Sequence, residues 1–123
     1  MNDTDELTDK ISGADSLIKL FGYWPSFHDA EIVELCLRTQ GISELKIRLT
    51  GEESLSGSAL NVIIVFEMAE IESLELLDFC SQNIILELVI IHTGSSFKID
   101  IDGSVGLSGT FTTKQLSVKI LDS

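Results

Sequence analysis

One stretch of the chain concentrates the residue types that could do chemistry. Residues 21–31 contain the only tryptophan, the only tyrosine and the only proline, together with a histidine next to an aspartate. His28 could serve as a general base or a metal ligand, with Asp29 orienting its ring. Neighbouring residues on an extended strand point to opposite faces, however, so Asp29 is badly placed for that role.

The same stretch has a structural interpretation, which we favour. In this interpretation Trp24 and Phe27 plug the open end of the predicted sheet. His28 and Asp29 then form hydrogen bonds with turn backbone that the sheet leaves unpaired. A catalytic site normally shows convergent partners, and the sequence provides none beside these two residues. We therefore expect a structural role and no catalytic residue here.

Other chemistry-bearing residues are too dispersed to define a site. His92, Cys36 and Cys80 lack the close spacing of metal ligands, so we predict no metal and no cofactor. Both cysteines are expected to be reduced, buried small hydrophobes. No serine lies in a nucleophile-elbow pattern, and no glycine run forms a phosphate loop. The protein is therefore predicted not to be an enzyme.

Acidic residues dominate the middle of the chain. No lysine or arginine occurs from residue 49 to residue 97. Clustered carboxylates concentrate negative potential, which steers a basic protein towards the domain. A solvated face that maintains solubility and protects a strand edge explains the same pattern. The candidate partner-binding face consists of Glu67, Glu70, Glu72, Glu75 and Asp78.

Composition and charge set the class of protein. The length of 123 residues suits one domain, and a hydrophobic fraction of 44% supplies a core. A net charge of -12 repels phosphates, so we expect no direct contact with nucleic acid and none with a membrane. The acidic N-terminus does not resemble a secretory signal, and the apolar runs are far shorter than the ~20 residues of a membrane span. We expect a cytoplasmic protein.

Periodicity predicts a mostly β fold of the α+β class. One short N-terminal helix is expected over residues 14–21, ended by Gly22. Residues 1–12 are expected to be a disordered or frayed acidic segment, and residues 13–123 to form a single domain. About eight short, largely antiparallel strands should build a sandwich or a strongly curved sheet.

Individual strands follow from alternation and from apolar runs. Residues 43–49, 97–102 and 116–120 alternate between apolar and polar side chains, as half-buried strands do. Residues 60–66 and 84–91 are apolar on both faces, which is typical of central strands covered on both sides.

The segment at residues 68–79 is ambiguous. Met68, Ile71, Leu74 and Leu77 fit helical spacing, and strict alternation fails at residues 76–77. We interpret it as a strand that carries a bulge.

Eight consecutive residues form a recognisable motif. The run Trp-Pro-Ser-Phe-His-Asp-Ala-Glu at residues 24–31 resembles the signature of the bacterial immunity protein 50 family, whose members are encoded beside polymorphic toxins. Residues 79–84 and 106–111 resemble two further segments of that family, in the expected order. The positions that match the motif include Trp24, Pro25, Phe27, His28, Asp29 and Glu31.

The resemblance implies a cytoplasmic, mostly β domain that binds and neutralises a cognate toxin without catalytic residues. A basic nuclease is the toxin that the charge favours, because nucleases grip phosphates with basic surfaces. The alternative is a small ligand-binding or homo-oligomeric assembly domain, for example a homodimer, with no toxin partner. A hydrolase that uses His28 and Asp29 is the third hypothesis.

Overall fold

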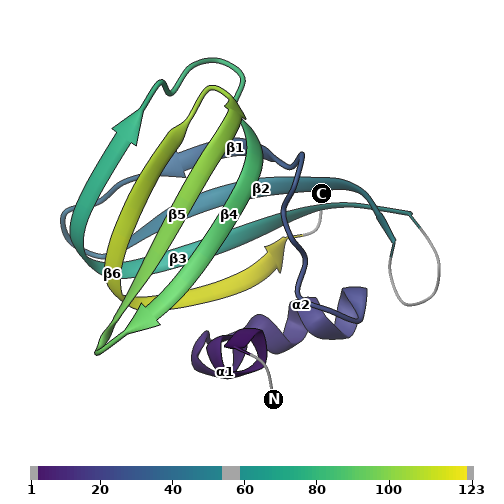
Figure 1. Ribbon diagram of the computed structural model, residues 1–123, viewed down its shortest axis with the longest axis horizontal. Coiled ribbons are helices and arrows are strands. Elements are labelled where there is room, and N and C mark those ends of the chain that lie inside the picture. Colours follow the sequence, from purple (N-terminus) through teal and green to yellow (C-terminus); the bar gives the residue numbers. More distant parts are fainter. Residues whose placement is uncertain (1–2, 54–58, 122–123) are drawn as a thin grey trace.

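The computed structural model describes residues 3–53 and 59–121, and it is built mainly of antiparallel β-structure (Figure 1). Within these ranges, two helices precede six strands that close into a barrel in the order β1-β2-β3-β6-β5-β4. The elements are α1 (Asp3–Lys10), α2 (Ala14–Phe21), β1 (Glu31–Cys36), β2 (Ile42–Glu53), β3 (Ala59–Leu77), β4 (Ile84–Thr93), β5 (Ser96–Val105) and β6 (Ser108–Leu121). The predicted mostly β class is confirmed.

The described residues form six strands rather than about eight, because some predicted strands are continuous. Residues 60–66 and most of residues 68–79 belong to β3, which is 19 residues long. Strand β6 likewise continues through residues 116–120. The register of β3 against β6 shifts between Ile71 and Ser73, which confirms the predicted bulge. A bulge lets a long strand bend with the barrel wall instead of ending.

Helix α2 occupies the residues predicted for it. Leu17 and Phe21 lie one turn apart on its buried face. Gly22 ends the helix in the left-handed region with a φ of 89°, and its N–H donates to the carbonyl oxygen of Ile18 at 2.7 Å. This is the termination expected from a glycine that follows the last helical residue.

The N-terminal segment was expected to be frayed, and this expectation is wrong for residues 3–10, which form α1. Leu7 and Ile11 are four residues apart and reach the core from one side of the segment. Thr8 between them is also buried. Acidic neighbours obscure this short apolar face in the sequence.

Both helices lie at one end of the barrel, beneath the strands in Figure 1. Ala14, Leu17 and Phe21 of α2 join the core there. None of the helices in the described ranges is long and apolar enough to cross a membrane.

The two apolar runs have different surroundings. Val65 in β3 is fully buried, which agrees with a covered central strand. In β4, however, Leu86, Val89 and Ile91 are 45%, 40% and 47% exposed. The expectation of two covered faces is therefore wrong for β4, because the helices cover the end of the barrel and not its outer wall.

The barrel closes through a short junction between β1 and β4. Only Glu31 and Ile84 are paired in register between the two strands as described. Backbone hydrogen bonds reinforce this point: the N–H of Ile85 donates to Ala30 at 2.9 Å, and the N–H of Ile32 donates to Asn83 at 2.8 Å. Beyond the junction the two strands diverge, which leaves one edge of β4 without a strand partner in the described chain.

Candidate docking surface

The His28–Asp29 pair lies beside this junction. The Nδ1 atom of His28 is 2.8 Å from the carbonyl oxygen of Leu86, and its Nε2 atom is 3.5 Å from Oδ2 of Asp29. The carbonyl can only accept, so Nδ1 carries a proton in this arrangement. Asp29 was expected to be badly placed to orient the ring, but it lies beside it, because Phe27 and Asp29 both have a left-handed φ of 65° rather than an extended backbone.

This geometry ties His28 to one backbone carbonyl and to one carboxylate. Both ring nitrogens of His28 already have partners, and the side chains of His28 and Asp29 are 56% and 76% exposed. The ring instead connects the segment before β1 to the backbone of β4. That contact is of the kind expected from the structural interpretation.

The other motif residues contribute to packing and to one ion pair. Phe27 is fully buried and packs on Phe66 with a ring-centroid distance of 5.5 Å. Trp24 is half-buried and lies against both rings, at 5.8 Å and 6.3 Å. Pro25 is buried, and Glu31 accepts from Arg48 at 3.2 Å. The motif therefore anchors the chain across the barrel interior.

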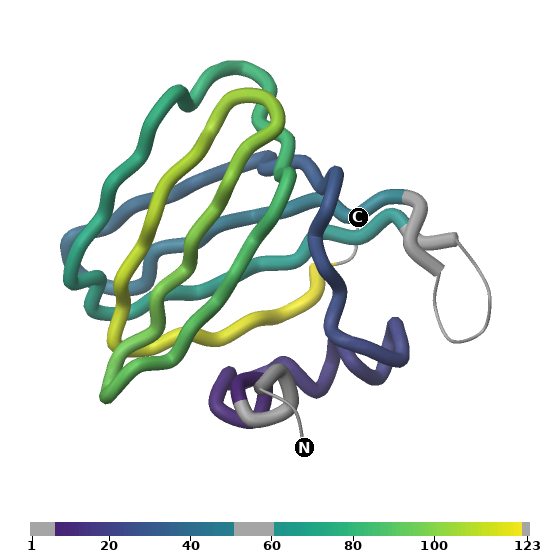
Figure 2. Tube along the Cα trace, viewed as in Figure 1, coloured from purple at the N-terminus to yellow at the C-terminus, as the bar shows by residue number. Residues whose placement is uncertain are grey.

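Asn83 is a buried polar residue whose role the sequence did not reveal. Its Oδ1 atom accepts from the N–H of Cys80 at 3.1 Å and from the N–H of Leu107 at 2.9 Å. Its Nδ2 atom donates to the carbonyl oxygen of Cys80 at 2.8 Å. The β3–β4 connection and the β5–β6 turn lie at the same end of the barrel in Figure 2, and Asn83 joins them.

The five acids of the predicted partner-binding face lie on or just after β3, but they do not share one surface. Glu67 pairs with Lys119 at 3.4 Å, and Glu72 accepts a hydrogen bond from Ser96. Glu70 lines a cavity of about 400 Å³ between β3 and the β1–β2 connection, where Arg38 also lies. Asp78 is exposed just beyond the end of β3.

Glu75 instead belongs to a groove that the sequence did not reveal. This groove has a volume of about 350 Å³ and lies on the wall formed by β3, β6, β5 and β4. We call it the acidic groove, and it is lined by Glu75, Glu87, Asp100 and Asp102 with the apolar side chains of Leu77 and Val89. These six side chains are exposed, whereas Ile99 and Ile101 of β5 alternate with the aspartates and face the core.

Strand register explains why these carboxylates meet. Asp102 lies directly opposite Glu87 across β4 and β5. Asp100 pairs with Val89 on one side and with Thr110 on the other, and Thr110 pairs in turn with Glu75. Residues directly opposite in an antiparallel pair have Cβ atoms about 5 Å apart. Three strands, β3, β4 and β5, therefore bring four negative charges to a small area.

Ion pairs in the described chain lie elsewhere on the barrel. Glu34 accepts from Lys46 at 2.9 Å on the β1–β2 side, and this hydrogen bond and the negative charge of Glu34 raise the pKa of Lys46 above its ordinary value. Glu31 and Glu67 also have cationic partners. None of the ion pairs found among the described residues includes a carboxylate of the acidic groove, so its charge remains available to a partner.

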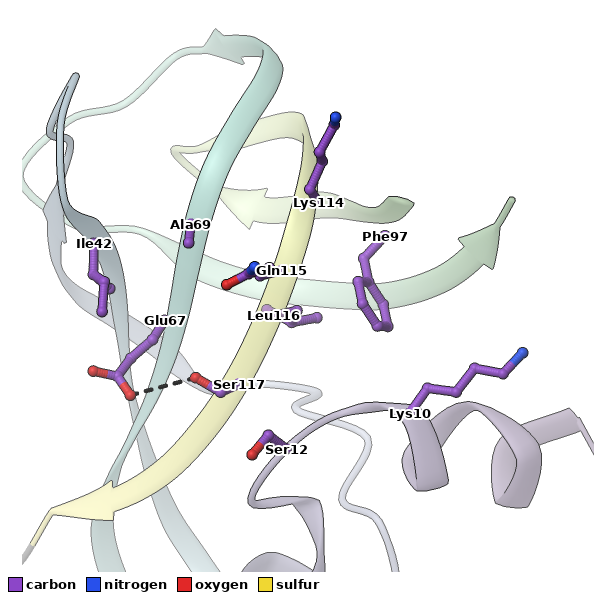
Figure 3. Close-up of a pocket in the computed structure, with 10 residues that line it drawn as sticks. All are labelled: Lys10, Ser12, Ile42, Glu67, Ala69, Phe97, Lys114, Gln115, Leu116 and Ser117. Carbon is purple, nitrogen blue, oxygen red and sulfur yellow. Dashed lines mark hydrogen bonds between the residues drawn. The ribbon is translucent and has the colours of Figure 1, made fainter. Parts of the chain in front are cut away.

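A larger cavity of about 430 Å³ lies between β6 and the helical end (Figure 3). Lys10 and Lys114 stand at its border, and Ser117 donates to Glu67 at 3.4 Å within it. Its cations and its carboxylate partly offset one another. The acidic groove differs from this cavity because all the charged residues that line it are negative.

The cysteines and His92 are not brought together. Cys36 is half-buried and Cys80 is exposed, so neither cysteine is fully buried as expected, and the expectation is wrong for Cys80. The ring of His92 packs on Phe97 with centroids 4.6 Å apart. In the part of the chain that the structure describes, no three His, Cys, Asp or Glu side chains gather as metal ligands would.

The fold and the site define a helix-capped β-barrel domain with an acidic groove on its outer wall. Comparison of the chain with family models, with curated proteins and with solved structures found no match.

Proposed function

We propose that the protein is an immunity protein that binds a cognate bacterial toxin in the cytoplasm and neutralises it by occlusion. The acidic groove is its docking surface, and the complementary surface of the toxin is basic, as on a nuclease. The chain itself performs no catalysis in this role. The resemblance of residues 24–31 to the immunity protein 50 signature supports this class.

The observation that carries the proposal is the charge of the groove. Glu75, Glu87 and the two aspartates of β5 act over a short range without cationic neighbours in the groove lining. Leu77 and Val89 lie among them and are 55% and 40% exposed. On such a surface, charges raise the rate of association and select the partner, whereas apolar groups that become buried on binding contribute affinity.

Co-expression with the toxin domain encoded next to this chain tests the proposal. In a bacterial host the chain should restore growth, and the purified pair should bind with an affinity that falls as salt is raised. Asp100→Lys should weaken binding by about a hundredfold, because a cation then faces a cationic surface.

Asp9→Lys provides the matched control. It makes the same change of net charge at an exposed position on α1, and it should leave binding unchanged within about threefold. Equal losses of binding affinity in both variants would show that net charge causes the effect, and they would refute the role of the acidic groove as the docking surface. The absence of any toxin gene beside this one, or growth arrest that the chain does not relieve, would count against the function itself.

One observation favours the alternative of a homo-oligomeric assembly domain. Val89 and Ile91 are exposed on β4, which has an edge without a strand partner in the described chain. Self-pairing of this kind strengthens with salt, since two chains of net charge -12 repel one another. Light scattering at low and high salt separates the two functions. The ligand-binding version needs a closed apolar pocket near Trp24, and Trp24 lines none of the three cavities described above.

A further inference from the structure

The free edge of β4, which comprises residues 86–93, lies directly beside the acidic groove. Strand β4 pairs with β5 along its whole length, whereas its register with β1 is limited to Ile84. An edge of this kind presents N–H and C=O groups that can pair with another strand.

The direction of these backbone groups follows from the β4–β5 hairpin. Thr93 and Ser96 face one another across the two-residue turn Gly94–Ser95. Residues that flank a two-residue turn form a hydrogen-bonded pair, and such pairs alternate along an antiparallel ladder. The backbone groups of Leu88 and Ile90 therefore point away from β5, towards the free edge.

Two side chains mark the limits of the usable edge. At one end, the carbonyl oxygen of Leu86 already accepts a hydrogen bond from Nδ1 of His28. At the other end the Nζ atom of Lys10 lies 3.4 Å from Nδ1 of His92. A cation at that end disfavours a basic strand there. Leu88 and Ile90, whose side chains face the core, are left as the positions whose backbone groups can pair with an added strand.

The outer face of this edge is only partly protected: it carries Glu87 and has Lys10 near one end, but it has no proline. Proteins shield exposed edges with lysine, proline or a covering element. Here the outward side chains are Glu87, Val89 and Ile91, and the two apolar ones are 40% and 47% exposed. Behind them on β5 stand Asp102, opposite Glu87, and Asp100, opposite Val89.

We infer that β4 accepts an extended segment of the basic partner as an additional strand. This inference rests on the proposed function and specifies how the partner is held. The added strand pairs with Leu88 and Ile90 and carries basic side chains on the face shared with the acidic groove. Basic groups then lie beside Glu87 and its neighbour Asp102, and the apolar groups that alternate with them lie on the same side as Leu88 and Ile90. Backbone pairing of this kind is a recurring mode of peptide recognition.

A synthetic nonapeptide that alternates lysine and valine, with both ends blocked, is the probe. With ¹⁵N-labelled protein at low salt, the peptide should slow amide hydrogen exchange at Leu88 and Ile90 by about tenfold or more at saturation. The amide of Val89 should not respond, because it already faces β5. A peptide that alternates glutamate and valine should have no effect, since its charge has the wrong sign.

Val89→Lys and Ser73→Lys form a matched pair of variants. Each adds one cation to the outer wall, at the free edge and three strands away respectively, and both positions are exposed. Val89→Lys should weaken the binding of the lysine–valine peptide by about tenfold or more, and Ser73→Lys by much less.

Three outcomes would overturn the inference. The first is peptide binding without slower exchange at Leu88 and Ile90, which would show docking by side chains alone. The second is no binding at millimolar peptide. The third is a dimer of the free protein that Val89→Lys dissociates, which would assign the edge to a second copy. Toxin neutralisation that persists alongside the first or second outcome would leave the proposed function intact.

Discussion

At the scale of single residues, Asn83 has the clearest energetic role. Its side chain satisfies the N–H groups of Cys80 and Leu107, and it is itself 3% exposed. We expect Asn83→Ala to lower the free energy of unfolding by about 3 kcal/mol, because each buried donor left unpaired costs about 1–3 kcal/mol. Chemical denaturation followed by Trp24 fluorescence measures the change.

Gln82→Ala is the control for this variant. The side chain of Gln82 is exposed and adjacent in sequence, so its removal should change the free energy of unfolding by less than about 0.5 kcal/mol. A similar loss for both variants would mean that Asn83 does not act through its buried hydrogen bonds.

Residue roles are the part of the molecule that the sequence predicts least. The Asn83–Leu107 bond spans 24 positions, so no local pattern points to it. Asp29 was judged badly placed to orient His28 on the assumption of an extended backbone. The left-handed φ values of Phe27 and Asp29 remove that assumption, and such values are foreseeable from the sequence mainly at glycine.

At the scale of elements, the junction of α2 with β6 depends on Gly13. Its φ is 89°, and a Cβ atom there would overlap the carbonyl oxygen of Val118. The N–H of Val118 donates to Ser12 at 2.8 Å, which holds the two segments together. Gly13→Ala should lower the free energy of unfolding by about 3 kcal/mol or more, since it adds steric overlap to backbone strain.

Gly41→Ala separates these two effects. Gly41 has a φ of 96° but nothing within 4 Å of the added Cβ atom. Its substitution should cost only the left-handed strain of about 1–2 kcal/mol. Equal costs at both positions, measured by denaturation under the same conditions, would rule out a tight contact between Gly13 and β6.

Elements were predictable where the local pattern is strong. Helix α2 and the bulge in β3 follow from spacing and from the failure of alternation. Helix α1 was missed because its apolar face consists of few residues among acids. The merging of two predicted strands into β3 depends on its partner β6, which lies far along the chain.

At the scale of the whole molecule, repulsion between the carboxylates of the acidic groove should lower the stability of the fold. Asp102 faces Glu87 directly, and like charges in that position destabilise a sheet. Asp102→Asn should therefore raise the free energy of unfolding by about 0.5 kcal/mol at low salt while it weakens partner binding. The gain should shrink as salt screens the repulsion.

Glu34→Gln should behave in the opposite way. Glu34 is paired with Lys46, so its neutralisation removes an attraction and should slightly lower the denaturation midpoint. Urea titrations at low and high salt compare the two variants. A loss of stability in Asp102→Asn would show that the groove carboxylates do not repel one another.

The sequence predicted an acidic, mostly β domain but not which of its acids lie together. Counting along β3 selected five carboxylates, and only Glu75 lines the groove. Asp100 and Asp102 were visible as the polar face of residues 97–102, and Glu87 was visible as a charge inside an apolar run. Their convergence depends on which strands are neighbours, and that property belongs to the complete sheet.

The pairing of β3 with β6 has a consequence for the order in which the molecule matures. These strands are joined in register from Ile63 with Leu121 to Leu77 with Ser108, so their contacts are distant in sequence. Contacts of this kind form slowly, because a long loop must close before any of them is gained. On the ribosome, β1 to β5 emerge before β6 can complete the wall, and residues 108–110 of β6 line the acidic groove. The acidic groove is therefore completed only after β6 has emerged.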